Sequence, residues 1–478
     1  MTTAIGIAYL VASLLFILGL RMLSSPVTAR NGNRVAAVGM TIALGATFFQ
    51  KDLSNYGLIA GAIVVGAVIG VGSARQVKMT AMPQMVAIFN GMGGGAAALV
   101  SALEFVHQTT GHATIQTSQA ATIALGAAIG SISFAGSIVA FVKLQELITS
   151  SAFQFRWTKF ANGLIFLALI ALGGAITAGS TSRLVLGVLL GLALLLGLVL
   201  VFPIGGADMP VVIALMNSLT GLAAALTGFV LNNELLIVGG ALVGASGTLL
   251  TLLMAKAMNR PVTNVLFGGF GATLSVEASL PPGVTIREIS VGDAAVLMSY
   301  SHRVVIVPGY GLAVAQAQHQ VRELADLLND RGVQVKYAIH PVAGRMPGHM
   351  NVLLAEADVP YSQVYEMDAI NGEFPSTDVV LVVGANDITN PGARDDPGSA
   401  IYGMPILNVD FAANIIVLKR SMRPGFAGID NPLYYNPKTS MLFGDARDSL
   451  QRLVAAVKSQ PGATSQFGQD KKPLAISR

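Results

Sequence analysis

The sequence of 478 residues contains no cysteine, and only 11% of its residues are charged. The absence of cysteine excludes disulfide bonds, thiolate metal sites and cysteine nucleophiles, and says little about the compartment. The scarcity of charge, together with a mean hydropathy of +0.65, predicts an integral membrane protein. Residues 1–260 hold 12 basic and 5 acidic side chains, and the rest hold 17 and 20. The pI of about 9.2 therefore reflects membrane loops, and we expect no nucleic-acid partner.

Nine apolar segments approach the ~20 residues that a helix needs to cross a bilayer core. They cover residues 3–23, 35–50, 56–73, 83–103, 118–142, 158–178, 183–202, 209–230 and 235–257. The second is the shortest. In lipid a single segment can hydrogen-bond all of its backbone N–H and C=O groups only as a helix, so these segments predict a bundle of about nine helices. The first is followed by another span, so we interpret it as a retained helix and not as a signal peptide. We expect most of the glycines, such as Gly57, Gly61, Gly66 and Gly70, to allow close helix packing.

Basic residues are unevenly distributed over the loops. The odd-numbered loops and the exit from the last segment carry ten of them, whereas the even-numbered loops carry only Lys51 and Arg183. The positive-inside rule therefore places the odd loops and the C-terminal domain in the cytoplasm, with the N-terminus outside.

Soluble patterns follow a change in composition near Arg260. We predict a membrane domain over residues 1–260, a linker rich in Gly, Ser and Pro over 261–300, and a soluble domain over 301–478. Helical patterns cover Ala313–Asp330 and Asp445–Lys458. Runs with strand character occur at Arg303–Val307, Val333–Ile339, Gln363–Met367, Asp378–Val383, Ile406–Val409 and Asn414–Leu418. Strands that alternate with helices predict a Rossmann-like α/β domain with a parallel sheet.

The turn Gly309–Val314 follows the first of these strands and opens a helix. In a dinucleotide site the first glycine permits the tight turn, and the second lets a pyrophosphate approach the helix N-terminus. Here the third fingerprint position is Val314 and not glycine, so the motif alone is weak. An ordinary strand–helix turn is the alternative.

The identity of the nucleotide depends on the charges near it. An NAD site usually has an acid at the end of the second strand, but Lys336–Pro341 contains none. The strand Asn414–Leu418 runs instead into Lys419–Arg423, whose cations and hydroxyl suit a 2′-phosphate and favour NADP. A solvated basic turn is the alternative.

Two further loops carry candidate ligands. The loop His340–His349 is punctuated by Gly and Pro and carries Arg345, so it can wrap a bound anion. Gly384–Asp387 follows an apolar strand, where ligands of such sheets bind. Asp387 can contact the nicotinamide end or simply cap the next turn.

Few polar residues lie within the predicted spans, and an ionisable one there is a functional candidate. Asp208 precedes Pro210 and can be either such a residue or the N-cap of the next helix. Asn217 and Asn90 lie inside spans. These amides can stitch helices together or hold a water wire, but neither titrates.

At this point the sequence resembles the beta subunit of proton-translocating NAD(P) transhydrogenase over nearly its whole length. The resemblance is carried by Met82–Ile88, Gly136–Phe141, Gly205–Val212, Lys256–Arg260, Pro308–Gln318, His340–Ala357, Gly384–Asp387 and Lys419–Met422. Runs of this length are far more specific than a short fingerprint.

The resemblance implies a proton-translocating membrane domain and an NADP(H)-binding domain, in a multi-pass protein of the bacterial cytoplasmic (inner) membrane. It implies that Asp387 works near the nicotinamide as the catalytic candidate, and that Asn90, Asp208 and Asn217 lie on the proton path. It also implies a cofactor site, in which Gly309 and Gly311 cradle the pyrophosphate and Lys419, Arg420 and Ser421 hold the 2′-phosphate. The whole cofactor-binding set is Gly309, Tyr310, Gly311, Ala313, Val314, Arg345, Gly384, Asn386, Asp387, Lys419, Arg420 and Ser421.

Two positions depart from the family pattern. Some members have a titratable histidine where this chain has Asn90, which leads to the hypothesis that a partner subunit supplies the histidine. Phe426 stands where a tyrosine can lie beside the cofactor, so the ring is kept and its hydroxyl is lost.

We therefore expect a transhydrogenase, Si/Re-specific by resemblance, that couples hydride transfer between NADH and NADP+ to proton movement into the cytoplasm. The chain has one dinucleotide fold, so NAD(H) must bind to an alpha partner subunit, and we expect a dimer of alpha–beta units surrounded by lipid. A nucleotide-gated transporter or channel without redox catalysis is the rival, although such proteins usually have broken helices and midplane charges. A reductase that is merely anchored would need fewer spans.

Overall fold

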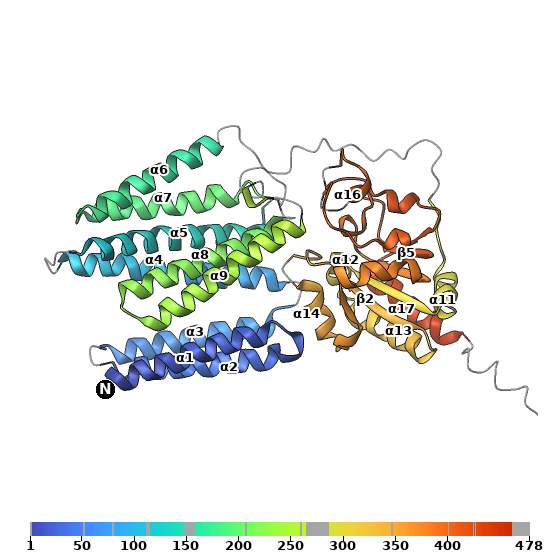
Figure 1. The fold of residues 1–478 in the computed structure, drawn as a ribbon, viewed down its shortest axis with the longest axis horizontal. Coiled ribbons are helices and arrows are strands. Elements are labelled where there is room, and N and C mark those ends of the chain that lie inside the picture. The colour runs from blue at the N-terminus through green and yellow to red at the C-terminus, as the bar shows by residue number, and fades with distance from the viewer. Residues whose placement is uncertain are drawn as a thin grey trace, which may run out of the picture. The chain divides into compact units, whose positions relative to one another are not determined.

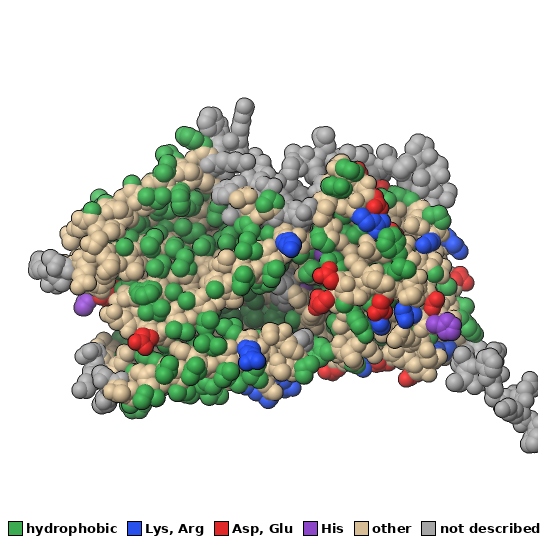
Figure 2. Space-filling model, viewed as in Figure 1, with side chains coloured by type: hydrophobic (Ala, Val, Ile, Leu, Met, Phe, Trp, Pro, Cys, Tyr) green, Lys and Arg blue, Asp and Glu red, His purple; other side chains and the backbone are tan. Residues whose placement is uncertain are grey.

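The computed structural model falls into two compact units, one helical and one α/β (Figure 1). It describes residues 2–50, 53–78, 81–110, 115–145, 147–148, 158–205, 208–258, 261–263, 286–345, 348–399, 401–423, 425 and 427–460. Figure 2 shows hydrophobic side chains over the visible face of the helical unit, whereas charged side chains gather over the α/β unit. The boundary between membrane-like and soluble composition is thus also a structural boundary.

The helical unit consists, among the described residues, of nine long helices that match the nine predicted segments. They are α1 (Thr2–Leu23), α2 (Pro26–Thr47), α3 (Tyr56–Gln76), α4 (Met82–Thr110), α5 (Thr117–Leu144), α6 (Thr158–Thr177), α7 (Arg183–Val201), α8 (Met209–Val230) and α9 (Glu234–Ala257). Eight of them are long and apolar enough to cross a membrane, and α2 is the exception. It begins at Pro26 and so includes Arg30 and Arg34, which the sequence had placed in a loop.

Glycine brings some of these helices into close contact, as the sequence predicted. A Cβ atom on Gly130 of α5 would lie 2.6 Å from the carbonyl oxygen of Gly94 in α4, and one on Gly197 of α7 would lie 2.5 Å from that of Ile132. The prediction was wrong for Gly57, Gly61, Gly66 and Gly70, beside which a Cβ would meet no atom within 4 Å. No described residue of α3 is buried.

The α/β unit is built on a sheet of six parallel strands in the order β3-β2-β1-β4-β5-β6. The strands are β1 (Arg303–Pro308), β2 (Gln334–Ile339), β3 (Val364–Glu366), β4 (Val379–Val383), β5 (Asn414–Lys419) and β6 (Thr439–Phe443). All five residues of β4 are buried, as expected for a parallel strand that is covered on both faces. This strand order is that of the dinucleotide-binding fold.

Three details differ from the strands and helices predicted. Ile406–Val409 is not a strand; its apolar side chains pack in the core, but Val409 begins the short 3-10 helix η6 (Val409–Phe411). The strand β6 had not been foreseen. The single helix predicted over Ala313–Asp330 is two, α12 (Tyr310–Val314) and α13 (Gln318–Asp330), separated at Gln316, whose φ is +51°.

The α/β unit also begins before Ser301, inside the segment assigned to the linker. Glu288 forms an isolated parallel bridge with Met441 of β6. The helix α11 (Val291–Ser299) starts at Ser290, whose hydroxyl accepts a hydrogen bond from the backbone of Asp293, and it packs on α17 (Ala446–Ser459). These contacts attach residues 286–300 to the sheet.

Candidate functional site

The strand order reverses between β1 and β4, and polar turns meet at the carboxyl ends of these two strands. Pro308 and Val383 are paired in register, and the chain then leaves in two directions. The backbone N–H of Gly309 donates to Val383 O and that of Gly311 donates to Gly384 O, each at 2.9 Å. Ligands of open α/β sheets bind at this type of switch point.

The glycines of this crevice serve the contact between its two turns. A Cβ atom on Gly309 would lie 2.5 Å from Ala385 Cα, and one on Gly311 would lie 2.7 Å from Gly384 Cα. Gly384 itself has a φ of +63°, which favours glycine. The position that a side chain at Gly311 would take is therefore occupied by the turn after β4. In the adjoining helix α12, Ala313 is fully buried, whereas Val314 is exposed.

Arg345 lies over the ring of Tyr310, with its Cζ 4.6 Å from the ring centroid. Its backbone N–H donates to Nδ1 of His349 at 3.0 Å. Burial, and then the charge of Arg345, lower the pKa of His349 to about 4, so this imidazole is neutral and able to accept. The predicted loop is thus fixed at its C-terminal end, with Arg345 and Tyr310 beside α12. Met346 and Pro347 lie outside the described residues.

The turn after β4 is tied to the segments that follow β5. Asn386 Oδ1 accepts hydrogen bonds from the hydroxyl of Tyr434 at 2.6 Å and from Asn431 Nδ2 at 3.0 Å. Asp387 begins the 3-10 helix η5 (Asp387–Thr389), yet its Oδ2 accepts from the backbone of Ala427 at 3.0 Å.

The basic segment at the end of β5 presents its charges in two different ways. Lys419 Nζ donates to Arg423 O at 2.6 Å and lies 4.6 Å from the centroid of the Tyr434 ring. Burial lowers the pKa of Lys419, although Asp387 and Asp430 oppose that change. Arg420 and Ser421 are exposed, and among the described residues neither side chain makes an ion pair or a hydrogen bond. These two groups are available to a ligand.

The second strand offers no such charge. Lys336 Nζ donates to both carboxylate oxygens of Glu373, at 2.9 and 2.6 Å, and lies over the ring of Tyr365. It therefore links β2 to the connection before β4. The cations near the crevice are those of the β5 end and Arg345.

In the helical unit, the predicted polar residues lie among side chains that the sequence had not singled out. Asn90 Nδ2 donates to the hydroxyl of Ser137 at 2.9 Å. Thr220, one turn after the partly buried Asn217, forms a 2.6 Å hydrogen bond with Ser133. Hydroxyl groups of Ser137 and Thr220 thus lie beside Asn90.

Asp208 is 1% exposed and directly precedes α8. It occupies the N-cap position, but its side chain makes no cap hydrogen bond to the helix. Lys143 is also buried, and its Nζ donates to Phe202 O at 2.5 Å and to Ile204 O at 2.7 Å. Two ionisable side chains of the helical unit, Asp208 and Lys143, are therefore buried.

The comparisons with known proteins bear on both units. The family model described as NAD(P) transhydrogenase beta subunit matches residues 5–456. Two relatives from Rhodospirillum rubrum, each named "NAD(P) transhydrogenase subunit beta", are 48% identical over 456 residues, which cover 94% of this chain and 98% of theirs.

The chain belongs to the NAD(P) transhydrogenase beta-subunit family. It is therefore the membrane subunit of a transhydrogenase, and the resemblance read from the sequence is confirmed. As a beta subunit it has an alpha subunit as its partner, and as a transhydrogenase it uses nicotinamide dinucleotides.

The structure of this beta subunit adds residues that the motifs did not reveal. Asn431 and Tyr434 reach the crevice from the β5–β6 connection, Tyr434 in the 3-10 helix η7 (Pro432–Tyr435) and Asn431 as the N-cap residue of that helix. No pattern in the sequence indicated them, because an Asn-Pro turn on a long connection is typical of any loop.

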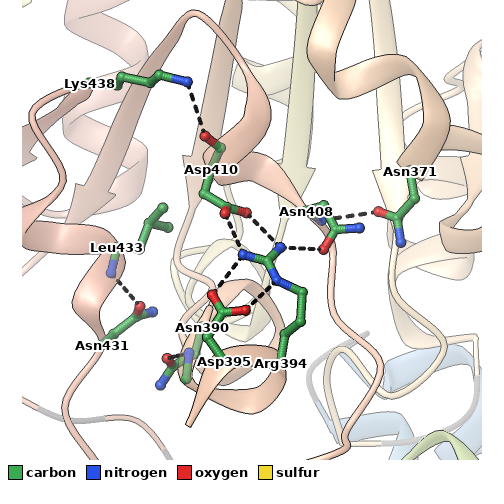
Figure 3. A network of polar contacts seen from close by, with 10 residues as sticks. Asn371, Asn390, Arg394, Asp395, Asn408, Asp410, Asn431, Leu433 and Lys438 are labelled. Carbon is green, nitrogen blue, oxygen red and sulfur yellow. Dashed lines mark hydrogen bonds and ion pairs between the residues drawn. The ribbon is translucent and has the colours of Figure 1, made fainter.

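A second polar network fixes the β4–β5 connection of the transhydrogenase chain (Figure 3). Arg394, in α16 (Gly392–Asp395), pairs with Asp410 at 2.7 Å and with Asp395 at 2.8 Å. It also donates to Asn408 Oδ1 at 3.0 Å. The network joins α16 to the residues just before β5, so it links the two ends of the long loop between β4 and β5.

Proposed function

We propose that this beta subunit binds NADP(H) at the β1–β4 crevice and couples hydride transfer to proton movement into the cytoplasm. The observation that carries the proposal is the availability of Arg420 and Ser421, together with Lys419, at the end of β5 beside a crevice whose second strand has no acid. Two cations and a hydroxyl suit the dianionic 2′-phosphate that distinguishes NADP(H) from NAD(H).

The residues present fit the cofactor. Asn386 Nδ2 is buried and has no hydrogen-bond partner among the described residues, so it is a donor that a bound nucleotide can satisfy. Arg345, held over Tyr310, supplies a cation for the pyrophosphate. The backbone N–H groups of Gly309 and Gly311 already bond to the β4 turn, so we assign these glycines to shaping the crevice rather than to donating to phosphate.

The bound nicotinamides supply the hydride chemistry, and the protein supplies binding and orientation. We propose that Asp387, held by the backbone of Ala427, is the charged group nearest the nicotinamide end. Tyr310, Ala313, Val314 and Gly384 shape the same crevice. NAD(H) binds to the alpha partner, because the described part of this chain contains a single dinucleotide-type sheet.

We propose that Asn90, Asp208 and Asn217 lie on the proton path, with a histidine supplied by the alpha partner. Asp208 is buried and ionisable. A buried ionisable side chain is costly in a membrane protein, and it is therefore a candidate for a functional role. Coupling requires that proton occupancy and the redox state of NADP(H) bias the same conformational equilibrium. With nine spans, as the sequence predicts, the N-terminus lies outside and the α/β unit lies in the cytoplasm of a bacterium, in a dimer of alpha–beta units. Family membership sets aside the nucleotide-gated transporter.

The proposal is tested by titrating the full detergent-solubilised chain with NADP+, NADPH, NAD+ and NADH. We expect preferential binding of NADP(H), and the double variant Lys419→Ala/Arg420→Ala to weaken it about 100-fold while NAD(H) binding changes little, since each charge-assisted hydrogen bond contributes about 1.5–3 kcal/mol. The matched control, Arg447→Ala/Lys458→Ala, removes two exposed cations of α17. Equal affinity for both nucleotides in the unmodified chain would refute the assignment.

A further inference from the structure

One side chain contacts both the turn after β4 and the end of β5. Tyr434 is 2% exposed and belongs to η7, whose N-cap Asn431 accepts a hydrogen bond from Leu433 N at 3.0 Å. With Pro432 in its first turn, this short helix is fixed before any ligand binds. The position of the Tyr434 ring is therefore set by the β5–β6 connection and not by the crevice.

The hydroxyl of Tyr434 orients Asn386. It donates to Asn386 Oδ1 at 2.6 Å, and Asn431 Nδ2 donates to the same oxygen at 3.0 Å. Burial and the nearby carboxylate of Asp387 raise the pKa of Tyr434 far above its usual value, so the phenol keeps its proton. Two donors on the oxygen fix the amide so that its Nδ2 points toward Gly425, where a Cβ would lie 2.6 Å away.

The ring of Tyr434 supports Lys419. The ammonium lies 4.6 Å from the ring centroid, within the range of a cation–π contact. The same ammonium donates to Arg423 O at 2.6 Å. Lys419 is thereby held between a ring face and a carbonyl, at the start of the basic segment, before a phosphate arrives.

A tyrosine that only fills the core looks different in the same unit. Tyr337 of β2 is fully buried, and its hydroxyl reaches only the backbone oxygen of Val321, at 3.4 Å. Tyr434 instead contacts two residues assigned to the nucleotide site, Asn386 and Lys419.

We propose that Tyr434 is a positioning residue that sets two parts of the NADP(H) site at once, Asn386 through its hydroxyl and Lys419 through its ring. The proposal rests on the proposed function of this chain as the NADP(H)-binding subunit. The two contacts are separable. Tyr434→Phe removes the hydroxyl and keeps the ring, whereas Tyr434→Leu removes both.

The experiment measures NADP+ and NAD+ dissociation constants on the full chain for the unmodified protein, both variants and the control Tyr337→Phe. We expect Tyr434→Phe to weaken the binding of both nucleotides by a similar factor, about 5- to 10-fold, because we assign Asn386 to a part of the cofactor that both share. We expect Tyr434→Leu to lower the preference for NADP+ over NAD+ by a further factor of about 5, because Lys419 loses its ring. Tyr337→Phe should change neither constant.

The outcomes distinguish the inference from the function on which it rests. An unmodified chain that shows no preference for NADP+ overturns the proposed function and the inference with it. The inference alone is overturned if the unmodified chain prefers NADP+ but the variants show no effect of Tyr434. In that case Tyr434→Phe binds both nucleotides as Tyr337→Phe does, and Tyr434→Leu keeps the preference for NADP+. A loss of folding would lower both affinities without changing their ratio, so the ratio in Tyr434→Leu separates positioning from stability.

Discussion

The backbone N–H of Gly311 donates to the carbonyl oxygen of Gly384 at 2.9 Å, so the turns after β1 and β4 are joined directly. Neither turn has room for a side chain at this contact. The crevice floor is therefore a backbone-to-backbone contact, and in the function that we propose nucleotide binding depends on groups at its rim.

Gly309→Ala should disrupt this floor. Its Cβ would lie 2.5 Å from the Cα and N atoms of Ala385, and the backbone atoms of this buried turn cannot move aside cheaply. We expect a loss of about 3 kcal/mol, at the upper end for overpacking, and loss of NADP+ binding. Gly372→Ala is the control, because a Cβ there meets nothing within 4 Å. Thermal unfolding of both variants gives the comparison, and equal melting temperatures would contradict the prediction.

Acidification should destabilise the α/β unit through His340. Its Nδ1 accepts from Val342 N at 3.2 Å and its Nε2 donates to Pro405 O at 2.8 Å. Burial lowers its pKa from 6.5 to about 4. The contribution of neutral His340 to the free energy of unfolding is therefore fully present above pH 6.5 and is lost as the pH falls toward 4. The reason is that the unfolded chain binds a proton that the folded chain excludes. The difference is on the order of 3 kcal/mol.

Urea unfolding between pH 7 and pH 4 measures this slope. His340→Asn should flatten it, whereas His319→Gln, which replaces an exposed histidine, should leave it as it is. An unchanged slope in His340→Asn would assign the pH dependence to other groups, such as His349.

Arg394→Lys should loosen the β4–β5 connection. Arg394 serves Asp395, Asp410 and Asn408 together, and a single ammonium cannot reproduce this planar fork. The Asp410 side chain is only 10% exposed, so weakening its partner is costly, by about 2 kcal/mol.

The control for Arg394→Lys is Lys458→Ala, which breaks an exposed ion pair with Glu323 and should cost less than about 0.5 kcal/mol. Limited proteolysis within residues 390–410 reports opening of the loop. Protection equal to that of the unmodified chain would show that the network does not hold the loop.

Replacing each of two adjacent glycines of α9 with leucine should have opposite outcomes, disruption at one position and tolerance at the other. A Cβ on Gly240 would lie 2.7 Å from Gly221 O and 2.8 Å from Ala225 Cα in α8, whereas one on Gly239 would meet nothing within 4 Å. Gly240→Leu should therefore separate α8 from α9, and Gly239→Leu should be tolerated. Size-exclusion chromatography in detergent measures the monodisperse fraction, and similar profiles would contradict the assigned packing.

Much of the architecture could be predicted from local patterns. Long apolar segments predicted nine helices, because the backbone of a segment in lipid must form all of its hydrogen bonds internally. Five of the six predicted strand runs are strands. The failure at Ile406–Val409 has a plain cause: a short apolar run is buried equally well as a strand or as a core loop, and periodicity does not separate the two. The strand β6 was missed because its first residues, Thr439 and Ser440, carry no apolar period.

The sequence by itself determined the membrane character, the parallel α/β unit, the family and the residues at the mouth of the crevice, because each depends on composition or on neighbours in the chain. Tertiary structure alone decided that Gly311 packs on Gly384, that Lys336 is engaged with Glu373, and that Tyr434 joins Asn386 to Lys419. These relationships connect residues far apart in the chain. They arise from the order in which strands pair, and that order is set by the packing of the whole sheet.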